Sequence, residues 1–257
     1  MSSRLNYGWR LLATGFCFSV FGLGGMLLWT FVFPVLRLFS HDLRRDRIRI
    51  AIHKSFGIFL RLMEGVGIMK MRVDGARMLG ECRQALVLAN HPTLIDVVAL
   101  ISLMPRAGCV VKQSLWKNPF LGGVVRAAGY IGNLDSDRLI DDCADEILAG
   151  RPMLVFPEGT RSIDGILSRF QRGAAYVALK SGMPIVPVLI DCDPSTLTKR
   201  EKWYQIPSRR FEYRLRVLDP IDMGPWVDAK ASRTIAARQL TRALEDHFSR
   251  ELEKWKP

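Results

Sequence analysis

The fold of this chain is indicated by residues 89–97, which read Ala89-Asn90-His91-Pro92-Thr93-Leu94-Ile95-Asp96-Val97. A short apolar run, Leu86 to Ala89, precedes the turn-forming residues, and a longer apolar run follows them. Because Pro92 has no amide hydrogen and a fixed φ, it suits the first turn of a helix better than the interior. The pattern therefore predicts a buried strand, a turn and a helix, with His91 and Asp96 at the turn.

His91 and Asp96 are the first candidate pair of catalytic residues. On one continuous helix, a separation of five positions would place the two side chains about 140° apart, but through a turn they can converge. Asp96 would then accept a hydrogen bond from one imidazole nitrogen while the other nitrogen faces a substrate. Such an imidazole can take a proton from a hydroxyl. A capped helix start with a structurally satisfied histidine fits the same spacing.

A second stretch, Phe156-Pro157-Glu158-Gly159-Thr160-Arg161-Ser162, follows another short apolar run. Together the two stretches resemble motifs of the glycerolipid (lysophospholipid) acyltransferases of the 1-acylglycerol-3-phosphate type, in a bacterial-looking form. The family's first motif, Asn-His-x-Ser-x-x-Asp, is matched by Asn90, His91, Thr93 and Asp96. Its third motif, Phe-Pro-Glu-Gly-Thr-Arg-Ser, is matched in full. A fourth, apolar motif with two prolines resembles residues 183–188.

The resemblance implies acyl transfer from a thioester donor to a hydroxyl of a lyso-glycerophospholipid such as 1-acylglycerol-3-phosphate. It implies that His91 is the general base and that Asp96 holds its imidazole in the right tautomer. The donor would be an acyl carrier protein or acyl-coenzyme A. No metal and no cofactor are expected, and no covalent enzyme intermediate is needed, because the thioester is already activated. The substrate-binding residues that we expect are Glu158, Gly159, Thr160, Arg161 and Lys112.

The family's second motif, often Gly-x-x-Phe-x-x-Arg, is not matched. The corresponding residues, 129–135, read Gly-Tyr-Ile-Gly-Asn-Leu-Asp, so that Gly132 replaces the aromatic residue and Asp135 replaces an arginine that helps to bind the acceptor's phosphate. Arg138 would compensate only if it faced the site. The acceptor is therefore open: an ornithine lipid, a glycolipid or an aryl-polyene lipid is an alternative. An inactive membrane scaffold is a further alternative, which the intact catalytic motifs disfavour.

Composition restricts the possible partners. The chain has 257 residues, a formal net charge of +12 and a pI near 9.9, so it favours anionic partners such as a phospholipid surface or an acidic carrier protein. It contains no recognisable nucleic-acid-binding module, and we expect no nucleic-acid partner. The five cysteines are scattered without a close pair, which indicates reducing surroundings and no disulfide framework.

The N-terminal part of the chain favours a membrane location. Residues 11–36 carry no charge and are numerous enough to cross a bilayer. Gly22, Gly24, Gly25 and Pro34 also allow a re-entrant or in-plane arrangement, so the sequence leaves span and hairpin open. Basic residues are more frequent after this run than before it. If the run spans, this excess places the catalytic side at the cytoplasmic face of a bacterial inner membrane.

Residues from about Asp42 to Met63 have the pattern of an amphipathic helix. The apolar residues of one face are Ile48, Ile52, Phe56, Phe59 and Met63, and basic residues lie opposite. Beside an apolar anchor, a basic face suits anionic headgroups at about 1 kcal/mol per charge. We therefore predict a helix lying at the membrane, with an ordinary core-facing surface helix as the alternative.

From Ile68 onward, short strand-like runs alternate with helical patterns. This order predicts an α/β layered domain with a central, mostly parallel sheet. We divide the chain into an N-terminal membrane segment with its amphipathic helix, residues 1–66, and a catalytic domain, residues 67–257. The expected strands are Met69–Val73, Leu86–Ala89, Cys109–Val111, Met153–Phe156, Ile185–Ile190 and Phe211–Val217. The expected helices are Leu94–Met104, Phe120–Ala128, Asp137–Ala149, Gln171–Ser181 and Ala229–Lys254.

Overall fold

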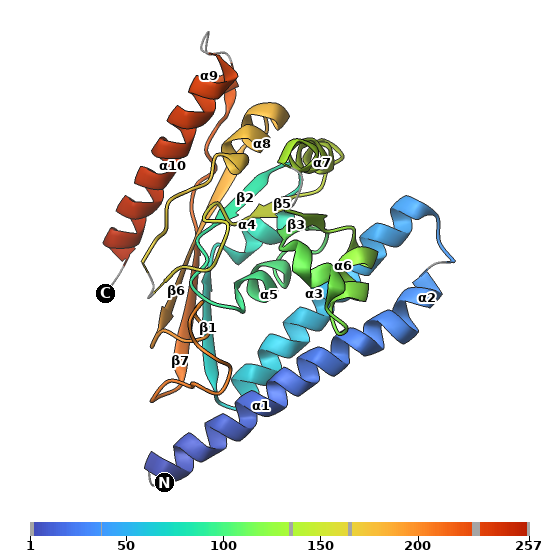
Figure 1. Cartoon of the computed structure of the whole chain (residues 1–257), viewed down its shortest axis with the longest axis vertical. Coiled ribbons are helices and arrows are strands. Elements are labelled where there is room, and N and C mark those ends of the chain that lie inside the picture. The colour runs from blue at the N-terminus through green and yellow to red at the C-terminus, as the bar shows by residue number, and fades with distance from the viewer. Residues whose placement is uncertain (1–2, 37, 134–135, 164–165, 228–231, 256–257) are drawn as a thin grey trace.

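The computed structural model describes residues 3–36, 38–133, 136–163, 166–227 and 232–255. Within these residues, seven strands form one sheet in the order β1-β7-β6-β2-β5-β3-β4 (Figure 1). The strands are β1 Met69–Asp74, β2 Leu86–Ala89, β3 Gly108–Val111, β4 Ile131–Gly132, β5 Met153–Val155, β6 Ile185–Asp193 and β7 Phe211–Val217. The predicted α/β architecture is thus confirmed, and the short strand β4 is an addition to the prediction.

The sheet is mostly parallel, as predicted. Strand β2 runs parallel to both β5 and β6, and β3 runs parallel to β5 and β4. The exception is β7, which pairs antiparallel with β6 and parallel with the edge strand β1. Strand β2 is buried on both faces: Val87 and Ala89 belong to one hydrophobic cluster, while Leu86 and Leu88 belong to the other. A strand covered on both faces is apolar throughout, which explains its unbroken apolar sequence.

Helices cover both faces of the sheet (Figure 1). On one face lie α3 His41–Gly65, α5 Asp96–Ile101 and α6 Gly122–Ala128, and on the other lie α7 Ser136–Leu148, α8 Gly173–Ser181 and α10 Arg233–Trp255. The short elements α4 Ala76–Glu81, η2 Gln113–Lys117 and α9 Gly224–Val227 were not expected from the sequence.

Two helices differ most from their predicted bounds, whereas the others are shifted by one or two residues at an end. The helix expected over Leu94–Met104 is α5, six residues long, because Leu103 and Met104 donate to carbonyl oxygens only three positions back, at 3.0 and 3.2 Å. Such bonds belong to a tightened final turn. The C-terminal helix begins at Arg233 and ends at Trp255, and part of the stretch expected to precede Arg233 lies outside the described residues.

The N-terminal segment is one helical arm that turns back into α3. It comprises α1 Ser3–Leu27, a π-helical turn η1 Leu28–Val32 and α2 Phe33–Leu36. Among the described residues, Leu5–Leu36 has the length and mean hydropathy, 1.9, of a membrane span. The arm lies beside α3 (Figure 1).

Both ends of this arm are held against the rest of the protein. At one end, the buried Arg10 donates to the carbonyl oxygens of Pro207 at 2.6 Å and Ser208 at 2.7 Å. At the other end, a Cβ on Gly123 of α6 would lie only 2.4 Å from the Trp29 ring. This glycine therefore lets the arm and α6 approach closely.

The α3 helix corrects one prediction. Its apolar face does not lie free for a membrane: Ile48, Ile52 and Met63 belong to the hydrophobic core, in contact with the sheet domain. Arg49, one of the basic residues of this helix, is 1 % exposed and pairs with Glu146 of α7 at 2.7 Å. The core-facing alternative is therefore correct for this face, because burying these side chains against α5, α6 and β1 removes their apolar surface from water.

Candidate active site

The two family-like motifs meet at one edge of the sheet. His91 follows β2 and Glu158 follows β5, and these two strands are adjacent and parallel. Both motifs therefore leave the sheet at its carboxyl edge, where open α/β sheets bind ligands. The amide of Ser162 donates to the carbonyl oxygen of His91 at 2.7 Å, which joins the two loops directly.

His91 and Asp96 converge through the turn, as the spacing suggested. The Nδ1 atom of His91 lies 2.7 Å from Oδ2 of Asp96, which is the first residue of α5. The Asp96 side chain is fully buried, whereas that of His91 is 15 % exposed. An ionised carboxylate can only accept, so Nδ1 carries the proton and Nε2 is left as the basic nitrogen.

Three further protein donors fix the Asp96 carboxylate. The amide of Thr93 donates to Oδ2 at 2.7 Å and the Thr93 hydroxyl to Oδ1 at 2.6 Å. The hydroxyl of Tyr213, on β7, donates to Oδ1 at 3.0 Å. Together with His91 Nδ1, these donors give each carboxylate oxygen of Asp96 two hydrogen-bond partners, which fixes its orientation. Sequence reasoning missed Tyr213; the available signal was a tyrosine among the buried positions of an alternating strand.

Phe156 fixes the plane of the imidazole. Its ring stacks on His91 with centroids 4.1 Å apart and an interplanar angle of 25°. The backbone then turns sharply, because the amide of Gly159 donates to the carbonyl oxygen of Phe156 at 3.0 Å. Gly159 has φ +69°, a conformation that glycine adopts without steric cost. Proline and glycine in this motif therefore form a turn beside the histidine.

Glu158 lies beneath the site. It is 3 % exposed, and its carboxylate accepts from the amides of His91 and Ser168, both at 2.8 Å, and from the Ser162 hydroxyl. Each carboxylate oxygen thus accepts from one main-chain amide, and the single Ser162 hydroxyl lies within hydrogen-bond reach of both. This arrangement differs from the substrate contact expected from the sequence.

Arg161 points to a third loop. Its Nη1 donates to the carbonyl oxygens of Leu197 and Thr198, both at 2.8 Å, and no other hydrogen bond of its guanidinium is found among the described residues. Burial lowers its pKa, while the charge of Asp96 opposes that shift. Because an arginine stays protonated in proteins, Arg161 carries positive charge close to the His91–Asp96 pair. Thr160 is partly exposed beside it.

Lys112 is the last of the predicted binding residues, and it lies farther along the same edge. Lys112 is exposed and directly follows β3, which is separated from β2 by β5. A Cβ on Gly132 would lie 1.9 Å from Oε1 of Gln113, so the glutamine side chain occupies that space. Asp135 lies outside the described residues. Arg138 is in α7 and exposed.

Cys192 is a thiol close enough to Asp96 to feel its charge, but its protonation argues against a role as nucleophile. Burial raises its pKa, and the nearby charge of Asp96 raises it further. The thiol therefore stays protonated at neutral pH, whereas a thiolate is the reactive form.

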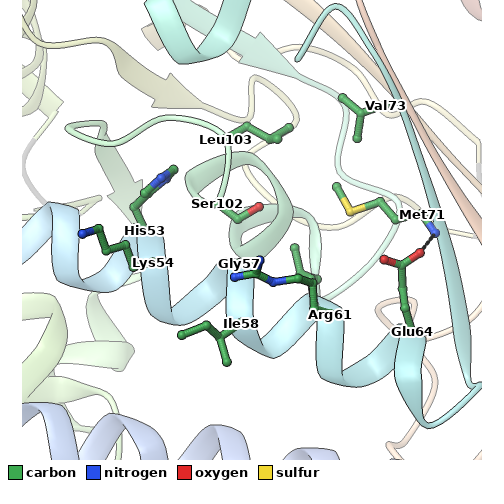
Figure 2. A pocket seen from close by; sticks show the side chains of 11 residues that line it. His53, Lys54, Gly57, Ile58, Arg61, Glu64, Met71, Val73, Ser102 and Leu103 are labelled. Carbon is green, nitrogen blue, oxygen red and sulfur yellow. Dashed lines mark hydrogen bonds between the residues drawn. The ribbon is translucent and has the colours of Figure 1, made fainter. Parts of the chain in front are cut away.

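A cavity of about 670 Å³ lies away from this pair, between α3, α5 and β1 (Figure 2). Its lining includes His53, Arg61 and Met71 but none of the predicted site residues. In Figure 2 the carboxylate of Glu64 reaches the amide of Met71, at 2.8 Å. That contact satisfies a donor on the outer edge of β1, where an unpaired strand would otherwise be exposed.

Comparisons with known proteins find the same family that the motifs resemble. Residues 70–191 match the family model described as Acyltransferase. The chain is 28 % identical over 199 residues to the chloroplastic 1-acyl-sn-glycerol-3-phosphate acyltransferase BAT2 of Brassica napus, covering 74 % of this chain and 54 % of that protein. It is 28 % identical over 160 residues to the human 1-acyl-sn-glycerol-3-phosphate acyltransferase beta, covering 58 % and 56 %. The chain thus spans about half the length of these relatives.

The fold has a solved counterpart. The crystal structure of the 1-acyl-sn-glycerophosphate (LPA) acyltransferase PlsC from Thermotoga maritima superimposes with a TM-score of 0.73 over 99 % of each chain, at 22 % identity. Residues 70–191, which contain both motifs, are similar to the acyltransferase family. Within that family the chain's relatives and its motifs are those of the 1-acylglycerol-3-phosphate type.

Proposed function

We propose that this protein is a membrane-associated O-acyltransferase that moves a fatty acyl group from a thioester donor to a hydroxyl of a lyso-glycerophospholipid. The observation that carries the proposal is the His91–Asp96 contact of 2.7 Å. In it a buried carboxylate, held by three other donors, orients an imidazole that remains accessible. A core histidine with a merely satisfied hydrogen bond would not need that exposure.

In the proposed mechanism, His91 Nε2 takes the proton of the acceptor hydroxyl as its oxygen attacks the thioester carbonyl carbon. Asp96 stabilises the imidazolium that forms. The carbon–sulfur bond then breaks, and the departing thiolate takes the proton from His91, so that the products are the ester and the free thiol. The ring of Phe156 keeps the imidazole in position for both transfers.

We assign Glu158 a positioning role in place of the predicted substrate contact. Its carboxylate already accepts from the amide of His91 and from that of Ser168 in the loop after β5, and it is buried. Arg161, Gly159, Thr160 and Lys112 remain the proposed acceptor-binding residues. They lie at the carboxyl edge of the sheet, and a guanidinium provides a planar fork that suits a phosphate.

One observation favours a second candidate acceptor. Gln113 fills the space beside Gly132, so this part of the edge presents a neutral amide instead of an aromatic ring. An acceptor without phosphate, such as a glycolipid or an ornithine lipid, fits this motif, in which Asp135 also replaces the phosphate-binding arginine. The chemistry at His91 would be unchanged.

The N-terminal arm supports membrane association. Its outward side chains include Leu12, Phe16, Leu23 and Phe31, each more than half exposed. Because both ends of the arm contact the domain, we propose that it lies along the membrane surface with the domain beside it. The cytoplasmic face, the division at residue 66 and the choice between acyl carrier protein and coenzyme A remain predictions from the sequence.

The proposal is tested with the purified full-length protein in detergent. A labelled acyl donor, carried on coenzyme A or on acyl carrier protein, is offered with a panel of lyso-acceptors with and without phosphate. We expect transfer to 1-acylglycerol-3-phosphate, and a loss of roughly 10²–10⁴ in rate for His91→Ala. His53→Ala is the matched control. His53 belongs to α3 and contacts the carbonyl oxygen of Ile101, at the end of α5 opposite to Asp96. Near-normal turnover of His91→Ala would refute the base assignment.

A further inference from the structure

Tyr213 lies at the centre of the site although it is remote in sequence. It belongs to β7, pairs in register with Cys192 of β6, and is fully buried. Its hydroxyl donates to Oδ1 of Asp96 at 3.0 Å, on the opposite carboxylate oxygen from the one that meets His91. The contact spans 117 positions of the chain and connects the last strand to the first motif.

We propose that Tyr213 is a positioning residue that sets the proton affinity of the His91–Asp96 pair through this hydrogen bond. The inference rests on the proposed function for its consequence in turnover, but its electrostatic part does not depend on turnover. A donor to Oδ1 draws negative charge away from Oδ2, so the carboxylate holds the imidazolium less strongly. Neutral His91, the form that acts as base, is thereby favoured at lower pH.

The hydroxyl remains a donor at every pH at which the protein would work. Burial raises the pKa of Tyr213 well above its ordinary value, and the charge of Asp96 raises it further. The other charged or titratable groups around the pair are Arg161 and Glu158 from the loop after β5 and Cys192 from β6. None of them needs to change when the tyrosine hydroxyl alone is removed.

Tyr213→Phe tests the proposal, because the ring is kept and only the donor is lost. A hydrogen bond to a charged group corresponds to roughly one pH unit or more in the titration of its partner. We expect the apparent pKa of the His91–Asp96 pair to rise by about that amount. The acid limb of kcat/KM then moves to higher pH, activity well below the apparent pKa falls roughly tenfold, and activity recovers toward the wild-type value at alkaline pH.

Tyr176→Phe is the control. Tyr176 is half-buried in α8 against the other hydrophobic cluster, and its hydroxyl has no hydrogen bond to any residue that the structure describes. This variant should keep both the wild-type pH profile and the wild-type titration. Thermal unfolding of both variants shows how much of any rate loss reflects folding alone.

A titration by NMR makes the test independent of catalysis. The chain has only four histidines, so labelled histidine gives few signals, and His91→Gln identifies the one of interest. We expect the His91 titration to shift upward in Tyr213→Phe, and downward in Tyr213→3-fluorotyrosine, whose more acidic hydroxyl donates more strongly. Unchanged His91 titration in both variants would overturn the proposal. A wild type without acyl transfer would refute the proposed function, yet the titration would still decide the role of Tyr213.

Discussion

Replacing Glu158 with glutamine separates a positioning role from a substrate-binding role. The carboxylate accepts from two main-chain amides, His91 on Oε1 and Ser168 on Oε2, both at 2.8 Å. Glutamine has a single side-chain carbonyl oxygen, so its NH₂ group must face one of these N–H donors. One buried amide therefore loses its acceptor, and the loops after β2 and β5 lose a connection.

The cost follows from those contacts. An unsatisfied buried donor costs about 1–3 kcal/mol, and replacing a charge-assisted bond by a neutral one costs about 1 kcal/mol more. Glu158→Gln should therefore lower the free energy of unfolding by roughly 2–4 kcal/mol. Because the displaced amide is that of His91 or lies in the adjoining loop, kcat should fall as well.

The measurements are chemical denaturation in detergent and steady-state kinetics. Glu245→Gln is the matched control: Glu245 accepts from one main-chain amide, that of Phe170 at 3.0 Å, which a glutamine oxygen can still satisfy. We expect its unfolding free energy to change by less than about 1 kcal/mol. If Glu158→Gln were as stable as this control and raised only the acceptor's KM, the positioning role would be wrong and the sequence-based substrate role would stand.

Three further predictions concern other parts of the molecule. Arg161→Lys should raise the KM for a phosphate-bearing acceptor roughly tenfold, more than it lowers kcat, because lysine lacks the bidentate fork; an unchanged KM would favour an acceptor without phosphate. Arg49→Met should destabilise the protein by about 3–5 kcal/mol, because Glu146 stays buried and loses its ion pair with Arg49. The control Arg61→Met, at an exposed position, should change the free energy of unfolding by less than about 0.5 kcal/mol in the same denaturation assay. Removing residues 1–40 uncovers the rings of Phe56 and Phe59 on α3, against which Phe21 packs. The truncated protein should therefore still float with vesicles, or aggregate, in 1 M salt, where charge attraction is screened within about 3 Å. A soluble, monomeric product would contradict this prediction.

The sequence by itself determined where six of the seven strands in the described residues occur along the chain, and that His91 and Asp96 meet at one turn. Leu86–Ala89 and Phe211–Val217 occur as strands with the predicted bounds, because burial on both faces or on one face leaves a direct signature in the order of apolar residues. The His91–Asp96 contact was also predictable, since both residues belong to one local turn.

What the sequence left undetermined depends on contacts between distant segments. The two readings of the α3 apolar face have the same periodicity, and only its packing on the sheet domain shows that the face is buried. Likewise, Glu158 is 67 positions from His91 and Tyr213 is 117 positions from Asp96, so no local pattern relates them. Their roles follow from the order of the strands, which places β5 beside β2 and aims a side chain of β7 beneath the first turn of α5.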